Sequence, residues 1–382
     1  MRLAASPALL FLHAVAGLFI FGLVLALPGT LFGIPSWTSA VHCDVAAQSN
    51  LLAVFFLGQL FCTALAGNLA DKFGPDRLIV GGTAVVAIGF LALAQAAGQG
   101  GVALGFALLA AGGSAINVGT NTLVSVTFGA RRGTMLSLAG LSCAVGALLT
   151  PFALQGWDAS VVQRLHVLAG VCAVVAVAPL AFADAPWTSA GFSVGAMLSL
   201  ARDRALVAVI VLTAIEFGVE AVIAGWGAAY ALAVLPGVAG GLVVTTYWAG
   251  LGIGRLMAPL VLARRSKPTT IAMCGLLAMS GIAIVGRAGS ASALLAGVSV
   301  AGIALGPLAP TLISMAGDRY PNRTGLAIGA VISLGQIGGV TLPWITGRAA
   351  IAVGFRGAML VPMAASLAIL AGAVTLRVRR GR

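Results

Sequence analysis

Apolar segments long enough to cross a lipid bilayer follow one another along almost the whole of this 382-residue chain. The hydrocarbon core of a bilayer is roughly 30 Å thick, which an α-helix crosses in about 20 residues. Sixty per cent of the residues are hydrophobic and only 8% are charged, whereas a soluble domain is typically about a quarter charged. No soluble fold buries that much apolar surface, so we expect an all-α membrane protein.

Polar and charged residues divide the sequence into twelve predicted spanning helices. The predicted spans are 8–34, 48–70, 78–97, 101–126, 134–156, 162–183, 205–230, 238–262, 269–286, 291–317, 325–346 and 356–376. These runs are far longer than the roughly 10 residues of a barrel strand, and a single segment in lipid satisfies its own backbone hydrogen bonds only as a helix. The first run lacks a clear signal-peptide cleavage site, so we expect it to remain as a span.

Basic residues are divided unequally between the two sides of this topology. Sixteen Lys and Arg residues fall in the tails and connections of one side and four on the other, while Arg255 lies inside a span. The positive-inside rule places the richer side, and with it both termini, in the cytoplasm. We expect a multi-pass protein of a bacterial-type inner (plasma) membrane. The net charge of +12 forms no basic stripe with interleaved aromatic residues, so nucleic acid is not an expected partner.

The longest polar connection lies near the midpoint and predicts two halves. We expect an N-terminal six-helix bundle over 1–183, a cytoplasmic linker over 184–204 and a C-terminal six-helix bundle over 205–382. A constant shift of 192 residues superposes Gly58 on Gly250, Arg131 on Arg323, Gly133 on Gly325, Gly146 on Gly338 and Pro151 on Pro343. The halves are therefore predicted to be parallel structural repeats related by an axis along the membrane normal. A monomer is expected.

A charged sequence, GNLADKFGPDR over residues 67–77, joins the second and third predicted spans. It resembles the loop signature of the major facilitator superfamily, G-x-L-a-D-r-x-G-r-r. The matching residues are Gly67, Leu69, Asp71, Lys72, Gly74 and Arg77, while Pro75 and Asp76 depart from it. The resemblance implies a latch, in which Asp71 pairs at a neighbouring helix end and the basic residues hold the cytoplasmic side closed. The alternative is an ordinary charged turn.

The second half carries a degenerate counterpart of this signature, Gly254-Arg255-Leu256, which lacks the aspartate. Arg255 is therefore a candidate for a weaker latch. Further stretches resemble the sugar-permease branch of the superfamily, which includes fucose permease and sodium-dependent glucose carriers. These are a glycine-rich fourth span containing Asn117 and Asn121, a G-x-E…G-W…Y stretch containing Glu220 and Trp226, and a G-x-x-G-G…P stretch containing Gln336.

Two acidic residues lie well inside a predicted span. Glu216 and Glu220 are spaced i,i+4, so they share one face of the seventh helix about halfway across the membrane. An acidic residue in a span costs roughly 2.5–3.5 kcal/mol on insertion scales, which makes it a candidate functional residue by default. We predict that Glu220 and Glu216 couple transport to a proton or sodium ion, and that Glu220 also contacts solute. The alternative is a structural pair neutralised by Arg255 on the next span.

Amide side chains form a second i,i+4 pair, Asn117 and Asn121, in the fourth span. Amides both donate and accept hydrogen bonds, which suits a sugar or polyol; the alternative is a role in helix–helix contact. The fourth span of fucose permease resembles E-x-x-x-N, and Asn117 stands where that pattern has a carboxylate. Proton coupling through this half is therefore in doubt. The remaining predicted solute-binding residues are Gln59, Trp226, Tyr247 and Gln336.

These observations favour a secondary active or facilitative transporter of a small polar solute, most readily a sugar, that works by alternating access. A drug or metabolite exporter of the same superfamily is the alternative, although its pocket would be mainly apolar. A membrane enzyme or receptor is disfavoured because the sequence shows no nucleophile–base pair, metal cluster or phosphate loop. The five scattered cysteines predict neither a metal site nor a disulfide framework. No cofactor is expected beyond a coupling ion.

Overall fold

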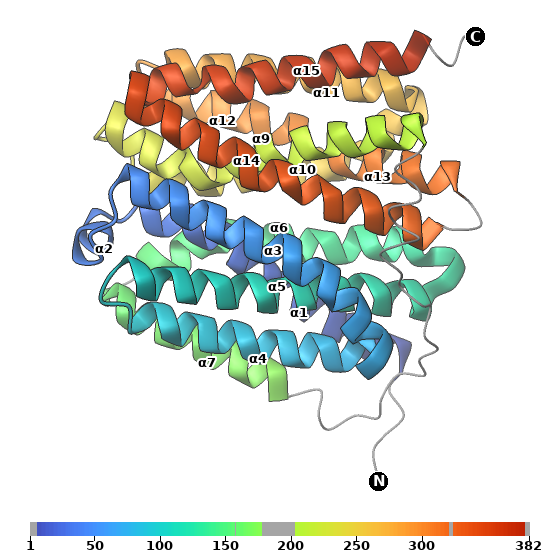
Figure 1. Cartoon of the computed structure of the whole chain (residues 1–382), viewed down its shortest axis with the longest axis horizontal. Coiled ribbons are helices and arrows are strands. Elements are labelled where there is room, and N and C mark those ends of the chain that lie inside the picture. Colours follow the sequence, from blue (N-terminus) through green and yellow to red (C-terminus); the bar gives the residue numbers. More distant parts are fainter. Residues whose placement is uncertain (1–5, 157, 178–202, 321–323, 379–382) are drawn as a thin grey trace. The chain divides into compact units, whose positions relative to one another are not determined.

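The computed structural model describes residues 6–156, 158–177, 203–320 and 324–378, and almost all of them are helical (Figure 1). The earlier part of the chain forms α1 (Pro7–Phe32), α2 (Pro35–Ala40), α3 (Val45–Phe73), α4 (Pro75–Ala94), α5 (Gln99–Phe128), the short helix η1 (Gly129–Arg131), α6 (Arg132–Gln155) and α7 (Val161–Val177). The later part forms α9 (Arg204–Val234), α10 (Gly240–Arg264), α11 (Lys267–Arg287), α12 (Ala291–Leu305), α13 (Leu308–Arg319), α14 (Thr324–Ala358) and α15 (Leu360–Val378).

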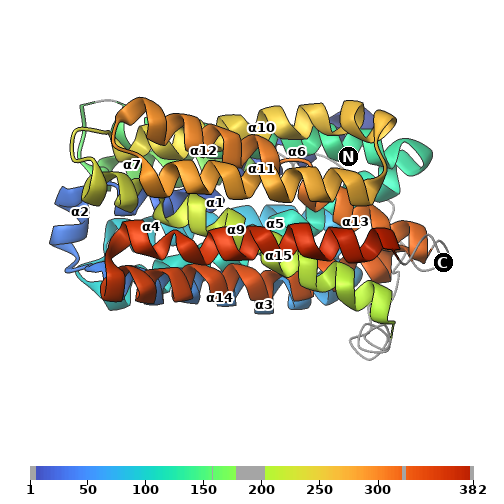
Figure 2. The same ribbon diagram turned by 90° about the horizontal axis from the view of Figure 1, so that it is seen from above.

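The chain divides into two compact units. Unit 1 comprises Met1–Ala47 and Val54–Phe192, and unit 2 comprises Gln48–Ala53 and Ser193–Arg382. In unit 1, α1 packs along α6, and α4 packs along both α5 and α7. In unit 2, α9 packs along α14, and α11 packs along both α12 and α15 (Figure 2). The predicted boundaries at 183 and 204 remain a prediction, because residues 178–202 lie outside the described part of the chain.

Nine helical segments of the described residues are long and apolar enough to cross a membrane. Each of the twelve predicted spans overlaps a described helix, and α7 and α15 contain shorter apolar stretches of Val161–Val177 and Leu360–Val374. The prediction of a helical, multi-pass membrane protein is confirmed. The count of twelve spans stays a prediction.

Capping residues set where several helices begin. Asp44 accepts a hydrogen bond from the Ala47 amide at 2.8 Å at the start of α3, and Asp203 accepts one from the Ala205 amide at 2.9 Å at the start of α9. Such caps satisfy N–H groups that have no partner within the helix. Pro75 opens α4 directly after Gly74, whose φ of 89° favours glycine. The loop signature at residues 67–77 therefore forms a tight α3–α4 turn.

Glycines bring α1 and α6 of unit 1, and α9 and α14 of unit 2, into backbone contact. In unit 1, a Cβ atom on Gly146 would lie only 2.1 Å from the Phe19 carbonyl oxygen, and one on Gly22 would lie 2.0 Å from that of Cys143. In unit 2, a Cβ atom on Gly338 would lie 1.5 Å from the Ala214 carbonyl oxygen. Small residues allow this approach between membrane helices. Gly146 and Gly338, related by the 192-residue shift, thus have the same packing role.

Two predicted spans differ from the helices observed. The span at 291–317 consists of α12 and α13, which are separated at Gly306 and Pro307. A Cβ atom on Gly306 would lie 2.6 Å from the Leu251 carbonyl oxygen, so this break packs directly on α10. The span predicted to end at 346 instead continues in α14 until Gly354, whose φ of 76° kinks the helix.

Candidate functional site

The acidic pair predicted on the seventh span lies on α9 in unit 2. Glu216 is fully buried, and neither of its carboxylate oxygens has a hydrogen-bond partner among the described residues. Glu220, one turn later, is half-buried. Buried polar side chains are nearly always hydrogen-bonded, and a buried ionised carboxylate without a partner is costly. This costly arrangement marks the middle of α9 as a candidate site.

Two α10 residues, Tyr247 and Arg255, belong with this pair, and Trp248 packs against Tyr247. Tyr247 and Trp248 are fully or almost fully buried, and the Tyr247 hydroxyl and the Trp248 Nε1 also lack hydrogen-bond partners within the described ranges. The guanidinium of Arg255 attracts both carboxylates, and both carboxylates act electrostatically on Tyr247. We call Glu216, Glu220, Tyr247 and Arg255 the α9–α10 cluster. It concentrates two acids, one cation and a phenol inside a helical bundle.

Arg255 lies nine residues before the end of α10, within the helix, and is half-buried. This position inside a span is the one expected from the sequence, and the role of Arg255 as a weaker latch stays a prediction. Its guanidinium attracts Glu216 and Glu220, which is the charge contact that the alternative interpretation requires. No direct ion pair joins Arg255 to either carboxylate among the described residues, so the cluster keeps its acidic groups available.

The predicted amide pair lies on α5 in unit 1. The Asn121 Nδ2 donates to both the backbone carbonyl and the Oδ1 of Asn117, each at 2.8 Å. The Asn121 backbone carbonyl in turn accepts from the Ser125 hydroxyl at 2.7 Å. Both amides are half-buried. Asn117 Nδ2 and Asn121 Oδ1 remain as one donor and one acceptor that bond to no other described residue.

Gln59 on α3 is 2% exposed, and its Nε2 has no partner in the described part of the chain. Its backbone carbonyl accepts a hydrogen bond from the Ser114 hydroxyl at 3.3 Å, and Ser114 accepts one from the Thr63 hydroxyl at 3.2 Å. Ser114 and Thr63 were not predicted. The available signal was their spacing, since Ser114 is three residues before Asn117 and Thr63 is four after Gln59.

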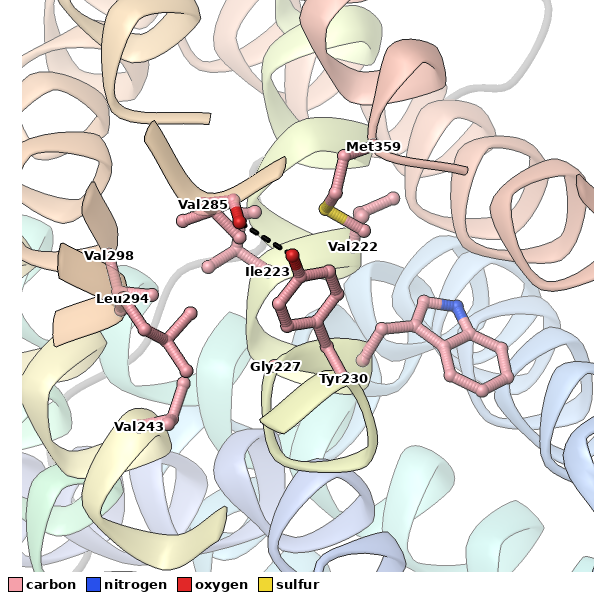
Figure 3. A pocket seen from close by; sticks show the side chains of 10 residues that line it. Val222, Ile223, Gly227, Tyr230, Val243, Val285, Leu294, Val298 and Met359 are labelled. Carbon is pink, nitrogen blue, oxygen red and sulfur yellow. Dashed lines mark hydrogen bonds between the residues drawn. The ribbon is translucent and has the colours of Figure 1, made fainter. Parts of the chain in front are cut away.

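Among the described residues, no hydrogen bond joins Trp226 or Gln336 to the α9–α10 cluster. The Trp226 indole is fully buried, and its Nε1 donates to the Pro343 carbonyl at 2.9 Å, so this N–H is already used. Trp226 also lines a small apolar pocket of unit 2 (Figure 3). The Tyr230 hydroxyl in that pocket donates to the Val285 carbonyl at 2.5 Å. The pocket is therefore poorly suited to a polar solute. Gln336 is half-buried on α14.

The predicted latch residues occupy the end of α3 and the first turn of α4. Lys72 is exposed, and its Nζ lies 5.1 Å from the centre of the Phe73 ring. Gly67 and Asp71 belong to the last two turns of α3, Gly74 forms the turn, and Arg77 follows in α4. Their role as a latch stays a prediction.

Comparison with known proteins gives the fold. No family model and no curated protein matches the sequence. A mutant of the nucleoside transporter NupG aligns with a TM-score of 0.80 at 13% identity, covering 96% of this chain and 99% of that one. A mutant of the E. coli fucose:proton symporter FucP aligns with a TM-score of 0.68 at 20% identity, covering 97% and 99%.

A bacterial homologue of the human lysosomal transporter Spinster, in an inward-facing and unoccupied conformation, aligns with a TM-score of 0.76 at 13% identity, covering 96% of each chain. These structures belong to transporters, and FucP is described as a major facilitator superfamily transporter. The chain has their fold over nearly its whole length. The predicted resemblance to the superfamily is confirmed at the level of the fold.

Proposed function

We propose that this protein is a transporter that carries a small neutral polar solute, most readily a sugar, across the membrane by alternating access. The observation that carries the proposal is two groups of polar side chains, buried or half-buried, within the apolar helices of a transporter fold. One is the set of amides and hydroxyls on α3 and α5, and the other is the α9–α10 cluster. Polar groups inside spanning helices are costly and generally functional.

The chemistry of these groups favours a solute with many hydroxyls. Asn117 and Asn121 supply a donor and an acceptor, and Gln59 supplies a further donor. A sugar hydroxyl both donates and accepts, so it can pair with either kind of group. A nucleoside is the second candidate solute, because its ribose carries the same hydroxyls and a nucleoside transporter aligns with a TM-score of 0.80.

Coupling to an ion is assigned to unit 2. Glu220 and Glu216 are the proposed sites for a coupling proton or sodium ion, and Arg255 is the cation that limits repulsion between them. A fucose:proton symporter among the structural neighbours supports this coupling. Asn117 cannot exchange a proton, so unit 1 is proposed to bind solute without carrying the ion.

The proposed topology follows from the charge distribution. We infer twelve spans with both termini in the cytoplasm, in a bacterial-type inner membrane. The nine apolar helices of the described residues and a sixteen-to-four division of basic residues support this arrangement. The proposed working unit is a monomer.

Uptake into proteoliposomes tests the proposal. Purified protein is reconstituted, and accumulation of radiolabelled fucose, glucose and uridine is measured with a proton gradient, with a sodium gradient and with neither. We expect saturable uptake of at least one of these solutes, and a loss of more than tenfold in Asn121→Ala. The matched control is Asn50→Ala, because Asn50 is exposed. If none of the three solutes enters while apolar dyes are expelled, the exporter takes the place of this proposal.

A further inference from the structure

One carboxylate in unit 2 receives hydrogen bonds from two helix ends. Asp203 caps α9 through the Ala205 amide. It also accepts two hydrogen bonds from the Arg319 guanidinium, one of them at 2.9 Å, and one from the Tyr320 hydroxyl at 2.6 Å. Arg319 and Tyr320 are the last residue and the C-cap of α13. The start of α9 is thus fastened to the end of α13.

The electrostatics of both helix ends favour this contact. The start of a helix carries partial positive charge and its end carries partial negative charge, so an anion at the start of α9 and a cation at the end of α13 are each stabilised. A fork of two hydrogen bonds between Arg and a carboxylate is among the stronger ion pairs. The Arg319 guanidinium holds the pKa of Asp203 well below its ordinary range, so the carboxylate is charged at neutral pH.

Unit 1 fastens the corresponding helices with an apolar contact. Phe11 of α1 and Phe128 of α5 meet edge to face, with ring centres 5.6 Å apart and planes at 83°. The shift of 192 residues relates Phe11 to Asp203 and Phe128 to Tyr320, since 203 − 11 and 320 − 128 are both 192. The two repeats therefore join the same pair of helix ends, one with aromatic rings and the other with charges.

The two joints differ in how easily they open. The Arg319 side chain is 50% exposed, so water can replace its hydrogen bonds to Asp203, and dissolved salt screens the pair. Opening the aromatic joint instead breaks a contact between apolar rings that neither water nor dissolved salt replaces. The charged joint is therefore reversible under conditions in which the aromatic joint stays closed.

We propose that Asp203, Arg319 and Tyr320 form a releasable tether that positions α9, and with it Glu216 and Glu220, during the working cycle. Asp203 is a positioning residue, because it lies at the N-cap of α9 and the acidic pair begins thirteen residues further on. Its link to transport rests on the proposed function. Opening of the tether itself is measurable without any solute.

Hydrogen–deuterium exchange of the full-length protein in nanodiscs tests the tether. Asp203→Asn is the sharpest change, because asparagine caps a helix as well as aspartate but carries no charge to hold Arg319. We expect amide exchange in the last turn of α13 to rise about tenfold. In the unaltered protein, 1 M KCl should produce a similar rise over 50 mM KCl, because the Debye length falls to about 3 Å. The salt effect should be absent from Asp203→Asn.

The matched control is Asp318→Asn. Asp318 lies next to Arg319 but pairs with Lys267 of α11 at 2.6 Å and is not bonded to α9. Exchange in the last turn of α13 should stay within twofold of the unaltered protein in this control, because an exposed ion pair contributes little. If Asp203→Asn yields too little folded protein, Tyr320→Phe removes the hydrogen bond from the Tyr320 hydroxyl to Asp203 and should raise exchange about threefold. Unchanged exchange in Asp203→Asn or in Tyr320→Phe, together with no salt effect, would overturn the tether.

The kinetics of solute uptake distinguish a positioning role of Asp203 from a purely structural one. In Asp203→Asn we expect the maximal rate of solute uptake to change at least threefold while the half-saturating concentration stays within twofold, since Asp203 touches no proposed solute group. A changed half-saturating concentration with an unchanged maximal rate contradicts the positioning role. If no solute is transported by the unaltered protein, the proposed function fails, and the exchange measurements still decide the tether.

Discussion

Units 1 and 2 share a helical framework but differ in what they hold inside it. Phe55 and Phe56 of α3 form a T-shaped pair with ring centres 5.2 Å apart, and Tyr247 and Trp248 of α10, 192 residues later, form another at 5.4 Å. The second pair adds a hydroxyl and an indole N–H that find no partner among the described residues. The two apolar rings of unit 1 pack in a similar way without any polar group, so the hydroxyl and the indole N–H of unit 2 are not needed for this packing.

The same contrast holds for the acidic pair. The 192-residue shift places Glu216 on Val24 and Glu220 on Pro28. Unit 1 therefore forms the equivalent stretch of α1 with no charge, and its predicted solute-binding residues Gln59, Asn117 and Asn121 are neutral amides. Because charged groups in a membrane helix are costly and unit 1 forms the same framework without them at these positions, we propose a functional role for the α9–α10 cluster.

Because the two units share a helical framework, substitution of equivalent glycines should destabilise the protein to a similar extent. In Gly146→Leu and Gly338→Leu the new side chain would collide with backbone on the facing helix, and we expect each to cost about 3 kcal/mol or more and to remove most folded protein. Fluorescence-detected size exclusion after heating measures this. Gly170→Ala is the control, because nothing lies within 4 Å of a Cβ atom there. Normal stability in either leucine variant would contradict the shared packing.

Removing the cation of the α9–α10 cluster should be the next largest effect. Arg255→Gln leaves Glu216 and Glu220 without a neighbouring positive charge, and we expect a loss of about 2 kcal/mol because Arg255 is only half-buried. The double variant Arg255→Gln with Glu220→Gln should recover much of this loss, as thermal unfolding in detergent will report. If the single variant is as stable as the unaltered protein, Arg255 does not offset the acidic pair.

Making unit 2 resemble unit 1 should stabilise it and impair its function. Glu216→Leu removes two buried oxygens without partners, and we expect a gain of about 1 kcal/mol in stability. Ion-driven uptake should fall at the same time. Thr213→Val is a useful control, because the Thr213 hydroxyl is already bonded to the Val209 carbonyl and its loss should not stabilise the protein. A destabilised Glu216→Leu would mean that the carboxyl has a structural role.

The smallest effect concerns pH. The pKa of Asp203 is lowered by Arg319 and Tyr320 in the folded protein, so the stability that it contributes is present above its ordinary value of about 3.9 and is lost only as the pH falls below that value. Amide exchange at the end of α13, corrected for its intrinsic rate, should therefore be constant from pH 8 to pH 5. A steep change within that range would show that another group controls the tether.

The lengths of the apolar runs predict much of the fold, and the errors in predicted helix ends have local causes. The span at 101–126 corresponds closely to α5, but the span predicted to end at 346 is too short, because the charged residue Arg348 two positions later does not end the helix. The Arg348 guanidinium in fact lies 5.3 Å from the centre of the Trp344 ring, and α14 continues to the kink at Gly354. A long basic side chain can keep its charge near a polar region while its helix continues.

Parts of the site were less accessible to sequence reasoning. The i,i+4 spacing of Glu216 and Glu220 and of Asn117 and Asn121 identified residues that the structure places on single helix faces. Ser114 was missed because hydroxyls in spans often bond to their own helix, as Thr213 does with Val209. That Ser114 instead bonds across to Gln59 depends on how α3 meets α5, which no local pattern reveals.

The central claim, that unit 2 carries the ion while unit 1 supplies neutral contacts to the solute, is tested most directly by comparing two kinds of transport in Glu220→Gln proteoliposomes. Exchange of labelled for unlabelled solute at equilibrium needs solute binding but no ion gradient, whereas accumulation against a solute gradient needs the ion. We predict that Glu220→Gln keeps exchange within about threefold and loses gradient-driven accumulation. Accumulation equal to that of the unaltered protein would contradict the assignment of coupling to the α9–α10 cluster.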